Sequence, residues 1–306
     1  MITKAFFRDR LVPADQALVS ITSPCYRYGC SVFEGVKGYW NHASQELFLF
    51  RLDEHVKRLE QSARLLRFEL NLATEGIKGA ILSLLREEQV RQDVHVVPSL
   101  YVSGEGDVAA TGPVELAVVA RPRARPAGFD RGIHCKVSSW ARISDDSMPP
   151  RIKSAANYQN SRLALLEARA DGYDGAILLT RDGRVAEATG ACVFILRGGV
   201  LITPTMTSGI LESITRQTVL TLATAHLSLR CVEREVDRTE LYISDEVFLC
   251  GTAAEITPVV SLDRQAIGSG APGLITRAMQ DCYIDIASGA VQDRPEWRTP
   301  VHSHVA

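Results

Sequence analysis

The stretch Arg151-Ile-Lys-Ser-Ala-Ala-Asn-Tyr-Gln-Asn-Ser161 places one lysine between a proline-containing loop and a helical pattern. Lysine is scarce in this chain, because only six of the 34 basic residues are lysine and the others are arginine. A desolvated lysine can lose its proton near neutral pH, which arginine cannot do. We therefore interpret Lys153 as a Schiff-base lysine, followed five residues later by Tyr158.

Length and composition restrict the remaining possibilities. A chain of 306 residues with 46% hydrophobic content can form two domains, each with its own core. A net charge of -2 gives no nucleic-acid footprint, and no apolar run approaches the length of a membrane span. The first ten residues lack the apolar core of a secretion signal. We expect a cytoplasmic protein without membrane or nucleic-acid partners.

The seven cysteines form no CxxC pair, and no histidines are spaced as zinc ligands. Unpaired cysteine commonly behaves as a small buried hydrophobe. We therefore predict free thiols and no metal site.

The first 120 residues alternate strand and helix patterns. Short apolar runs at residues 17–21 and 46–50 predict antiparallel strands. The segment between them, residues 28–39, contains three glycines. Such a segment is typical both of a structural hairpin and of a backbone that a ligand approaches closely.

Asp53 is expected to cap the helix that follows. Its predicted apolar face consists of Val56, Leu59, Ala63 and Leu66. Arg58 lies beside this face, where it could bind a ligand or pack along the helix by its stem. A second helix near residues 75–88 and strands at 95–103 and 114–120 complete a first domain, residues 1–120.

An arginine- and proline-rich segment, residues 121–131, is predicted to be an interdomain loop. The second domain, residues 132–306, opens with a strand at 134–139 and a helix at about 155–170. Two hairpins follow, with turns at Asp182-Gly183 and Gly198-Gly199.

Three features of the second domain could bind a ligand. Glu187 lies on an apolar strand, where a carboxylate needs a cation or a proton donor. Ser213 is a predicted N-cap, and the amides of Ile214 and Thr215 behind it could bind either water or phosphate. The segment 251–258 reads as a tight turn that offers further backbone donors.

Together these residues resemble the fold-type IV pyridoxal-phosphate aminotransferases, most closely the branched-chain amino-acid aminotransferases. The resemblance runs from about Phe6 to Ile286 and depends on five motifs in order. They are Tyr28-Gly-x-x-Val-Phe-Glu-Gly35, Phe50-Arg-Leu-x-Glu-His-x-x-Arg-Leu59, Ile152-Lys-x-x-x-Asn-Tyr158, Glu187 in its hairpin, and Ser244-Asp-Glu-Val-Phe-x-x-Gly-Thr-Ala-Ala-Glu-Ile-Thr-Pro258.

The resemblance implies roles for these residues. Lys153 would anchor pyridoxal 5'-phosphate and carry the proton between the substrate and the cofactor. Glu187 would face the pyridine nitrogen, and Tyr158 the phenolic oxygen. The phosphate would be held by Arg58, Ile214, Thr215 and Thr252.

It also implies a mixed α/β (α+β) fold, with a smaller α/β domain and a larger domain that has a β-barrel-like core. Members of the family form homodimers or larger assemblies, so we expect a homo-oligomer here.

The substrate is the least constrained part of the prediction. His95 and Val97 align where branched-chain enzymes carry a tyrosine and an arginine that bind carboxylate, and Ala191-Cys192 replaces Glu-Asn. The candidate substrate-binding residues are Tyr28, Phe33, Gly35, Lys37, His95 and Ala253.

We predict transamination between a hydrophobic L-amino acid and a 2-oxo acid such as 2-oxoglutarate. The alternatives are a D-amino-acid or (R)-amine transaminase, an aminodeoxychorismate-lyase-like enzyme and a non-catalytic relative.

Overall fold

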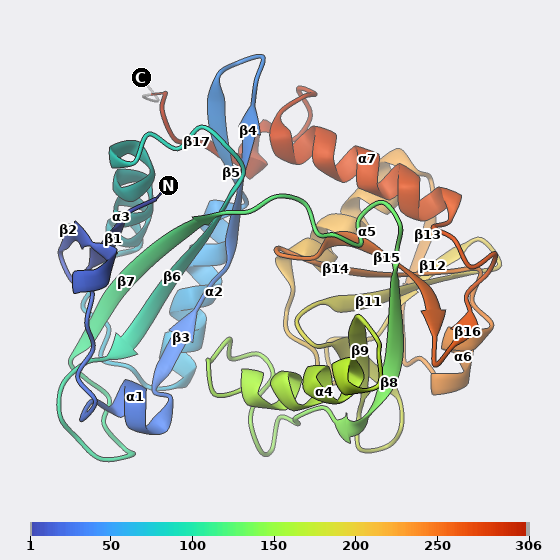
Figure 1. Cartoon of the computed structure of the whole chain (residues 1–306), viewed down its shortest axis with the longest axis horizontal. Coiled ribbons are helices and arrows are strands. Elements are labelled where there is room, and N and C mark those ends of the chain that lie inside the picture. The colour runs from blue at the N-terminus through green and yellow to red at the C-terminus, as the bar shows by residue number, and fades with distance from the viewer. Residues whose placement is uncertain (1, 304–306) are drawn as a thin grey trace. The chain divides into compact units, whose positions relative to one another are not determined.

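The computed structural model describes residues 2–303. The chain divides into two compact units, each containing helices and strands, and this confirms the mixed α/β class (Figure 1). The first unit comprises the chain up to Ala124, the short segment Ile152–Ala156 and the chain from Asp285 onward. The second comprises Arg125–Arg151 and Asn157–Ile284.

The first unit is built on an antiparallel sheet with the order β17-β5-β4-β6-β7-β1-β2, and β3 pairs with β6. The strands are β1 (Lys4–Phe7), β2 (Arg10–Pro13), β3 (Ser31–Phe33), β4 (Val36–Asn41), β5 (Glu46–Phe50), β6 (Val94–Val102), β7 (Val114–Pro122) and β17 (Arg298–Pro300). The helices are α1 (Pro24–Tyr28), α2 (Leu52–Leu65) and α3 (Thr74–Glu87).

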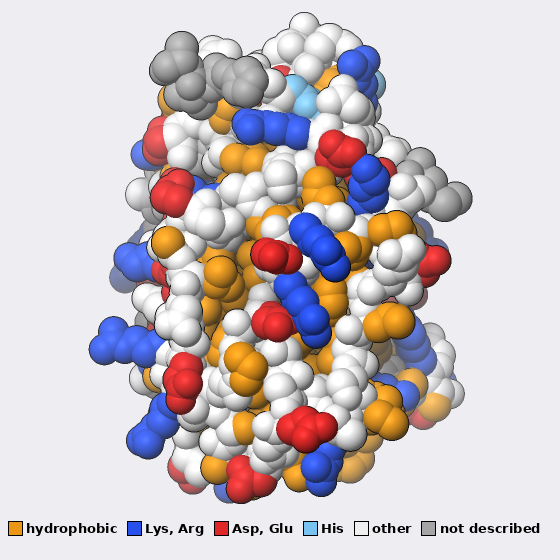
Figure 2. Space-filling view, turned by 90° about the vertical axis from the view of Figure 1, so that its left-hand side faces the viewer, with side chains coloured by type: hydrophobic (Ala, Val, Ile, Leu, Met, Phe, Trp, Pro, Cys, Tyr) orange, Lys and Arg blue, Asp and Glu red, His pale blue; other side chains and the backbone are white. Residues whose placement is uncertain are grey.

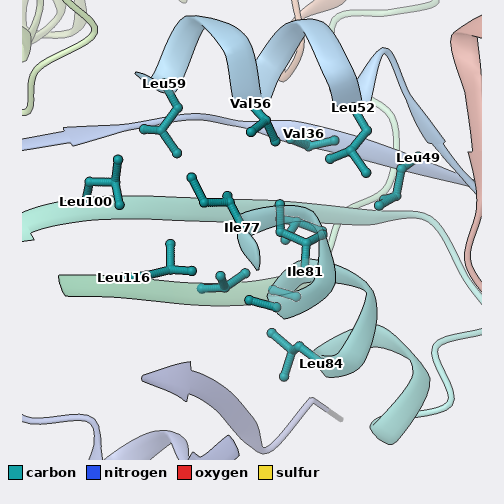
Figure 3. Packing of buried hydrophobic residues seen from close by; sticks show 14 of the residues in the cluster. Val36, Leu49, Leu52, Val56, Leu59, Ile77, Ile81, Leu84, Leu100 and Leu116 are labelled. Atoms are coloured by element: carbon teal, nitrogen blue, oxygen red, sulfur yellow. The ribbon is translucent and has the colours of Figure 1, made fainter. Parts of the chain in front are cut away.

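Helices α2 and α3 pack their apolar sides onto this sheet (Figure 3). The labelled core residues are Leu52, Val56 and Leu59 of α2, Ile77, Ile81 and Leu84 of α3, and the strand residues Val36, Leu49, Leu100 and Leu116. Complete burial of one such side chain stabilises the fold by about 1.5–3 kcal/mol. The apolar face predicted for α2 is confirmed at Val56, Leu59 and Ala63, which are fully buried.

The other face of the sheet carries the polar candidates. Successive side chains of a strand point to opposite faces, and the core takes Val94 and Val96 of β6. His95 between them therefore points the other way. Lys37 of β4 and Arg121 of β7 are its direct cross-strand partners, so these side chains share that face.

Charges of both signs are mixed on the surface seen in Figure 2. Lysine and arginine side chains lie beside aspartate and glutamate, with hydrophobic side chains between them. Ion pairs in the first unit such as Lys4–Glu87 and Arg8–Glu115 join opposite charges. This face therefore has no extended basic region of the kind that binds nucleic acid.

The second unit contains a mixed sheet with the order β10-β9-β8-β15-β14-β11-β12-β13, and β16 pairs with β15. The strands are β8 (Ile133–Ala141), β9 (Gly175–Leu179), β10 (Val185–Ala188), β11 (Cys192–Arg197), β12 (Val200–Thr203), β13 (Arg230–Glu233), β14 (Glu246–Gly251), β15 (Glu255–Leu262) and β16 (Gln265–Ala266). The helices are α4 (Tyr158–Ala170), α5 (Ile214–His226), α6 (Arg238–Tyr242) and α7 (Leu274–Ser288), whose last residues belong to the first unit.

This second sheet curls, because β10 at one end of the strand order contacts β11 in its other half. Side chains from both halves share one apolar core, including Ile177, Val185, Val193 and Val247. The expected barrel-like core is thereby confirmed. Both predicted hairpins are also confirmed, and Gly183 and Gly198 of their turns adopt positive φ angles of 80° and 55°.

Three local predictions were wrong. Residues 17–21 form no strand, and Leu18 and Ile21 are each 72% exposed, because no neighbouring strand pairs with them. Asp53 is not the N-cap of α2. The helix begins at Leu52, one residue before Asp53, and its N-cap is Arg51, whose φ angle is 56°. The segment 251–258 is mostly strand, and its turn contains only residues 252–254.

The lysine segment also differs from its prediction. The helix expected from residue 155 begins at Tyr158, because Ala155 donates its amide to the carbonyl of Ser31 instead. Residues 152–156 thus join the first unit, as does the chain from Asp285, where β17 pairs with β5.

Candidate active site

The lysine segment lies against strand β3 of the first unit. The amide of Phe33 donates to the carbonyl of Lys153 at 3.0 Å, and the Lys153 amide donates to Ser62 Oγ of α2 at 3.2 Å. Ser154 forms a bridge with Val32. The Lys153 Nζ lies 4.9 Å from the centroid of the Phe33 ring. Two motifs about 120 residues apart in sequence are therefore joined at the predicted Schiff-base lysine.

Arg58 is held by a buried carboxylate. Its Nε and Nη2 donate to the two oxygens of Glu34 at 2.6 and 2.7 Å, and Nδ1 of His55 lies 2.8 Å from Glu34 Oε2. Burial opposes ionisation of Glu34, but Arg58 and His55 outweigh it and hold the pKa of this carboxyl well below its usual value. Burial also lowers the pKa of His55. Arg58 is therefore fixed in orientation by a bidentate pair.

Lys37 and His95 lie side by side on the face of the first sheet that is opposite the apolar core. Lys37 is buried, and its Nζ donates to the carbonyl of Arg123 at 3.1 Å. Burial, followed by the charges of Arg123, Lys37 and Lys153, lowers the pKa of His95 to about 4. His95 is thus neutral at pH 7. The His95 ring packs against Gly35, where only glycine leaves enough room, since a Cβ at this position would lie 2.6 Å from His95 Nε2.

Glu187 lies on β10 of the second unit and is almost fully buried. Its Oε1 accepts from Arg142 Nη2 at 2.6 Å, and its Oε2 accepts from the Leu211 amide at 3.2 Å. The thiol of Cys192 lies 3.9 Å from Oε2. The expected partner of this carboxylate is therefore Arg142, an arginine directly after β8.

The predicted phosphate site begins at the N-terminus of α5. Ser213 caps this helix, because its Oγ accepts from the Arg216 amide at 3.1 Å, as predicted. Ile214 and Thr215 are its first residues and are both buried. A capped helix start, whose first amides have no carbonyl partner within the helix, suits an anion.

The other candidates are more exposed. Thr252 and Ala253 lie in the turn between β14 and β15, and Tyr158 is the first residue of α4. Tyr28 ends α1, and the guanidinium of Arg27 lies 4.9 Å from its ring. Val97 is partly buried on β6.

Between residues 2 and 303, the structure contains no helix long and apolar enough to cross a membrane. The same part of the chain has no group of three or more histidine, cysteine or acidic side chains arranged to bind a metal.

Residues 31–262 match the amino-transferase class IV family. This chain is a class IV aminotransferase. A probable branched-chain-amino-acid aminotransferase of Aquifex aeolicus is 41% identical over 97% of this chain and 96% of its own length. These matches confirm the family expected from the five motifs.

Solved structures agree with this assignment. The branched-chain amino acid aminotransferase of Thermobaculum terrenum in its PLP form is 44% identical, covers 98% of this chain and 99% of its own, and superposes with a TM-score of 0.93. The Escherichia coli enzyme is 32% identical, with a TM-score of 0.92 over 98% of this chain and all of its own. The expected enzyme class and pyridoxal-phosphate dependence of this class IV aminotransferase are thereby confirmed.

Two features of this class IV aminotransferase were missed by sequence reasoning. Glu34 stood in a quoted motif without a role, and only the folded chain places it against Arg58, 24 residues away. Arg142 lies 45 residues before Glu187, and nothing in the local pattern connects the two. The only signal was the cost of burying Glu187, which required a cation somewhere.

Proposed function

We propose that this protein transfers amino groups between a hydrophobic, branched-chain-like L-amino acid and a 2-oxo acid such as 2-oxoglutarate. The contact of Lys153 with Phe33 carries the proposal, because it joins the lysine to Tyr28–Gly35, the first of the five motifs that resemble the branched-chain enzymes. The relatives in Aquifex aeolicus and Thermobaculum terrenum support it, since both are named as branched-chain aminotransferases.

The side chains suit pyridoxal phosphate. When bound, this cofactor supplies an aldehyde that takes up the amino group and a ring that withdraws electrons from the substrate α-carbon. Arg58 and the amides of Ile214 and Thr215 provide donors for its phosphate, together with Thr252 in its turn. Buried Glu187 has the charge needed to hold a proton at the ring nitrogen, and Tyr158 would donate to the phenolic oxygen.

Lys153 then has two tasks. Its amine would bind the cofactor between turnovers and move a proton to and from the substrate α-carbon during turnover. The ring of Phe33, whose centroid lies 4.9 Å from the Nζ, borders the space in which this amine would act.

The substrate carboxylate needs cationic donors, each worth about 1.5–3 kcal/mol as a charge-assisted hydrogen bond. Val97 offers none, and neutral His95 offers an uncharged one. We assign this task to Lys37 and Arg121, which flank His95 in register, and to Arg123 nearby. Tyr28, Gly35 and Ala253 remain candidates for the pocket wall and its amides. We expect weaker selection for a carboxylate than in branched-chain enzymes, and detectable use of primary amines.

We further propose a homodimer or larger homo-oligomer in the cytoplasm. Exposed Leu18, Ile21 and Tyr26, which are each at least 70% accessible, support an interface in the first unit. All seven cysteines are free thiols, as expected in a reducing compartment. Sedimentation of the purified protein tests the first point, and a particle with the mass of a single 33.5 kDa chain would contradict it.

The substrate proposal is tested by comparing kcat/KM for L-leucine, D-leucine and (R)-1-phenylethylamine with one 2-oxo-acid acceptor. L-leucine should be used best, with measurable turnover of the amine. The absence of an arginine at position 97 favours one competitor, an (R)-amine transaminase. Amine turnover equal to or above that of L-leucine would establish that assignment instead.

A further inference from the structure

Arg142 is a buried arginine that the proposed reaction does not use. It follows the last residue of β8, and its side chain is 7% exposed. Its Nη2 lies 2.6 Å from Glu187 Oε1, which makes it the direct ionic partner of the carboxylate assigned to the ring nitrogen.

The guanidinium is fixed by other segments of the second unit. Its Nε donates to the carbonyl of Gly209 at 3.2 Å, and its Nη1 lies 3.5 Å from Asn160 Oδ1 on α4. The Arg142 amide donates to the carbonyl of Leu179 at 2.7 Å. Because a guanidinium is planar, these contacts orient the donor that faces Glu187. Arg142 therefore determines where one carboxylate oxygen lies.

The Arg142 cation, 2.6 Å from Oε1, also favours the ionised form of Glu187. A buried carboxylate without a cation takes up a proton, because a low-dielectric interior disfavours its charged form. The Leu211 amide donates a neutral hydrogen bond to Oε2, which offsets the burial of the charge less than a cation does. Only an ionised Glu187 can hold a proton at the ring nitrogen of the cofactor.

The other titratable neighbours do not replace Arg142. Cys192 on β11 lies 3.9 Å from Glu187 Oε2, and Cys250 is its cross-strand partner on β14. Burial and the charges of Cys192 and Glu187 raise the pKa of Cys250 well above its usual value, although Arg216 on α5 opposes this. Cys250 is thus neutral in the physiological range.

We propose that Arg142 is a positioning residue, which keeps Glu187 ionised and directs its carboxylate toward the ring nitrogen of pyridoxal phosphate. This rests on the proposed function and deepens it. Arg142 acts through Glu187 and need not touch the cofactor or substrate.

The test measures the dissociation constant of pyridoxal phosphate from pH 5.5 to 9, by quenching of tryptophan fluorescence. Arg142→Gln should bind the cofactor at least tenfold more weakly than wild type at pH 6. The difference should shrink as pH rises, because Glu187 without the Arg142 cation then loses its proton. Arg142→Lys retains a cation and should follow the wild-type pH profile.

Two further variants keep the proposal falsifiable. Glu187→Gln in the Arg142→Gln background removes the titrating carboxylate, so the additional pH dependence should disappear. Arg234→Gln breaks the Arg234–Glu240 ion pair elsewhere in the same unit and should bind as wild type does. The positioning role alone would be overturned by either of two results. In the first, the dissociation constant of Arg142→Gln changes with pH in parallel with that of wild type. In the second, Arg142→Lys binds the cofactor as weakly as Arg142→Gln does. A wild-type protein that binds no cofactor would overturn the proposed function and this inference together.

Discussion

At the scale of single residues, the environment of Lys153 has a direct consequence for catalysis. Lys153→Ala should remove the visible absorption of the bound cofactor and lower turnover. Loss of the proton-transfer role alone should lower kcat by about 10²–10⁴-fold. Loss of the covalent anchor should lower kcat further. Absorption spectra and kcat of the purified variant measure both. Lys57→Ala, an exposed lysine of α2, is the control and should match wild type. Near-normal transamination by Lys153→Ala would refute the lysine assignment.

The buried ion pair of Glu34 with Arg58 predicts a second effect at the scale of one residue, on the stability of the fold. Removing one partner of a buried ion pair lowers the free energy of unfolding by roughly 3–5 kcal/mol. Glu34→Gln should therefore be strongly destabilised in urea at pH 7. Glu87→Gln, which breaks the half-exposed Lys4–Glu87 pair, should leave the stability close to that of wild type, because solvent screens this pair.

The pH dependence of this effect has a definite sign. The pKa of Glu34 is lower in the folded protein than its usual value near 4.5. Its contribution is therefore complete above pH 4.5 and is lost as pH falls toward the folded pKa. The stability difference between wild type and Glu34→Gln should narrow below pH 4.5. A difference that is constant down to pH 3 would show that Glu34 acts by packing instead of by charge.

At the scale of elements, helix α5 combines a cap with the proposed phosphate site. Ser213→Ala removes the bond to the Arg216 amide and should lower the free energy of unfolding by about 0.5–2 kcal/mol. If the helix start also holds the phosphate, the variant should bind pyridoxal phosphate more weakly. Thr224→Ala near the other end of α5 is the matched control. If Ser213→Ala and wild type bind pyridoxal phosphate with equal affinity, Ser213 caps the helix but does not contribute to phosphate binding.

At the scale of the whole molecule, the proposal predicts that the cofactor stabilises the native state. A ligand that binds only the folded protein adds about 2.7 kcal/mol to its stability when present at a hundred times its dissociation constant. Removal of pyridoxal phosphate should therefore lower the midpoint of urea unfolding, and readdition should restore it. Identical midpoints at saturating cofactor would contradict cofactor binding to the native fold.

Much of this protein follows from short-range pattern, because the physical cause is itself local. Glycine turns determine the hairpins at 182–183 and 198–199, and a hydroxyl three residues from an amide determines the start of α5. The apolar spacing of α2 predicted the face that it buries. The motif order was sufficient for the family, with Lys153, Glu187 and Arg58 as the central candidates.

What the tertiary structure decided is how the buried charges are paired. A carboxylate on an apolar strand shows that a cation is needed, but its identity depends on which distant segments pack together. Glu187 meets Arg142, and Glu34 meets Arg58, only after the strands and helices between them have assembled. For the same reason residues 17–21, strand-like in composition, stay exposed. A strand needs a partner that supplies hydrogen bonds, and no periodicity within one segment reveals whether the fold provides one.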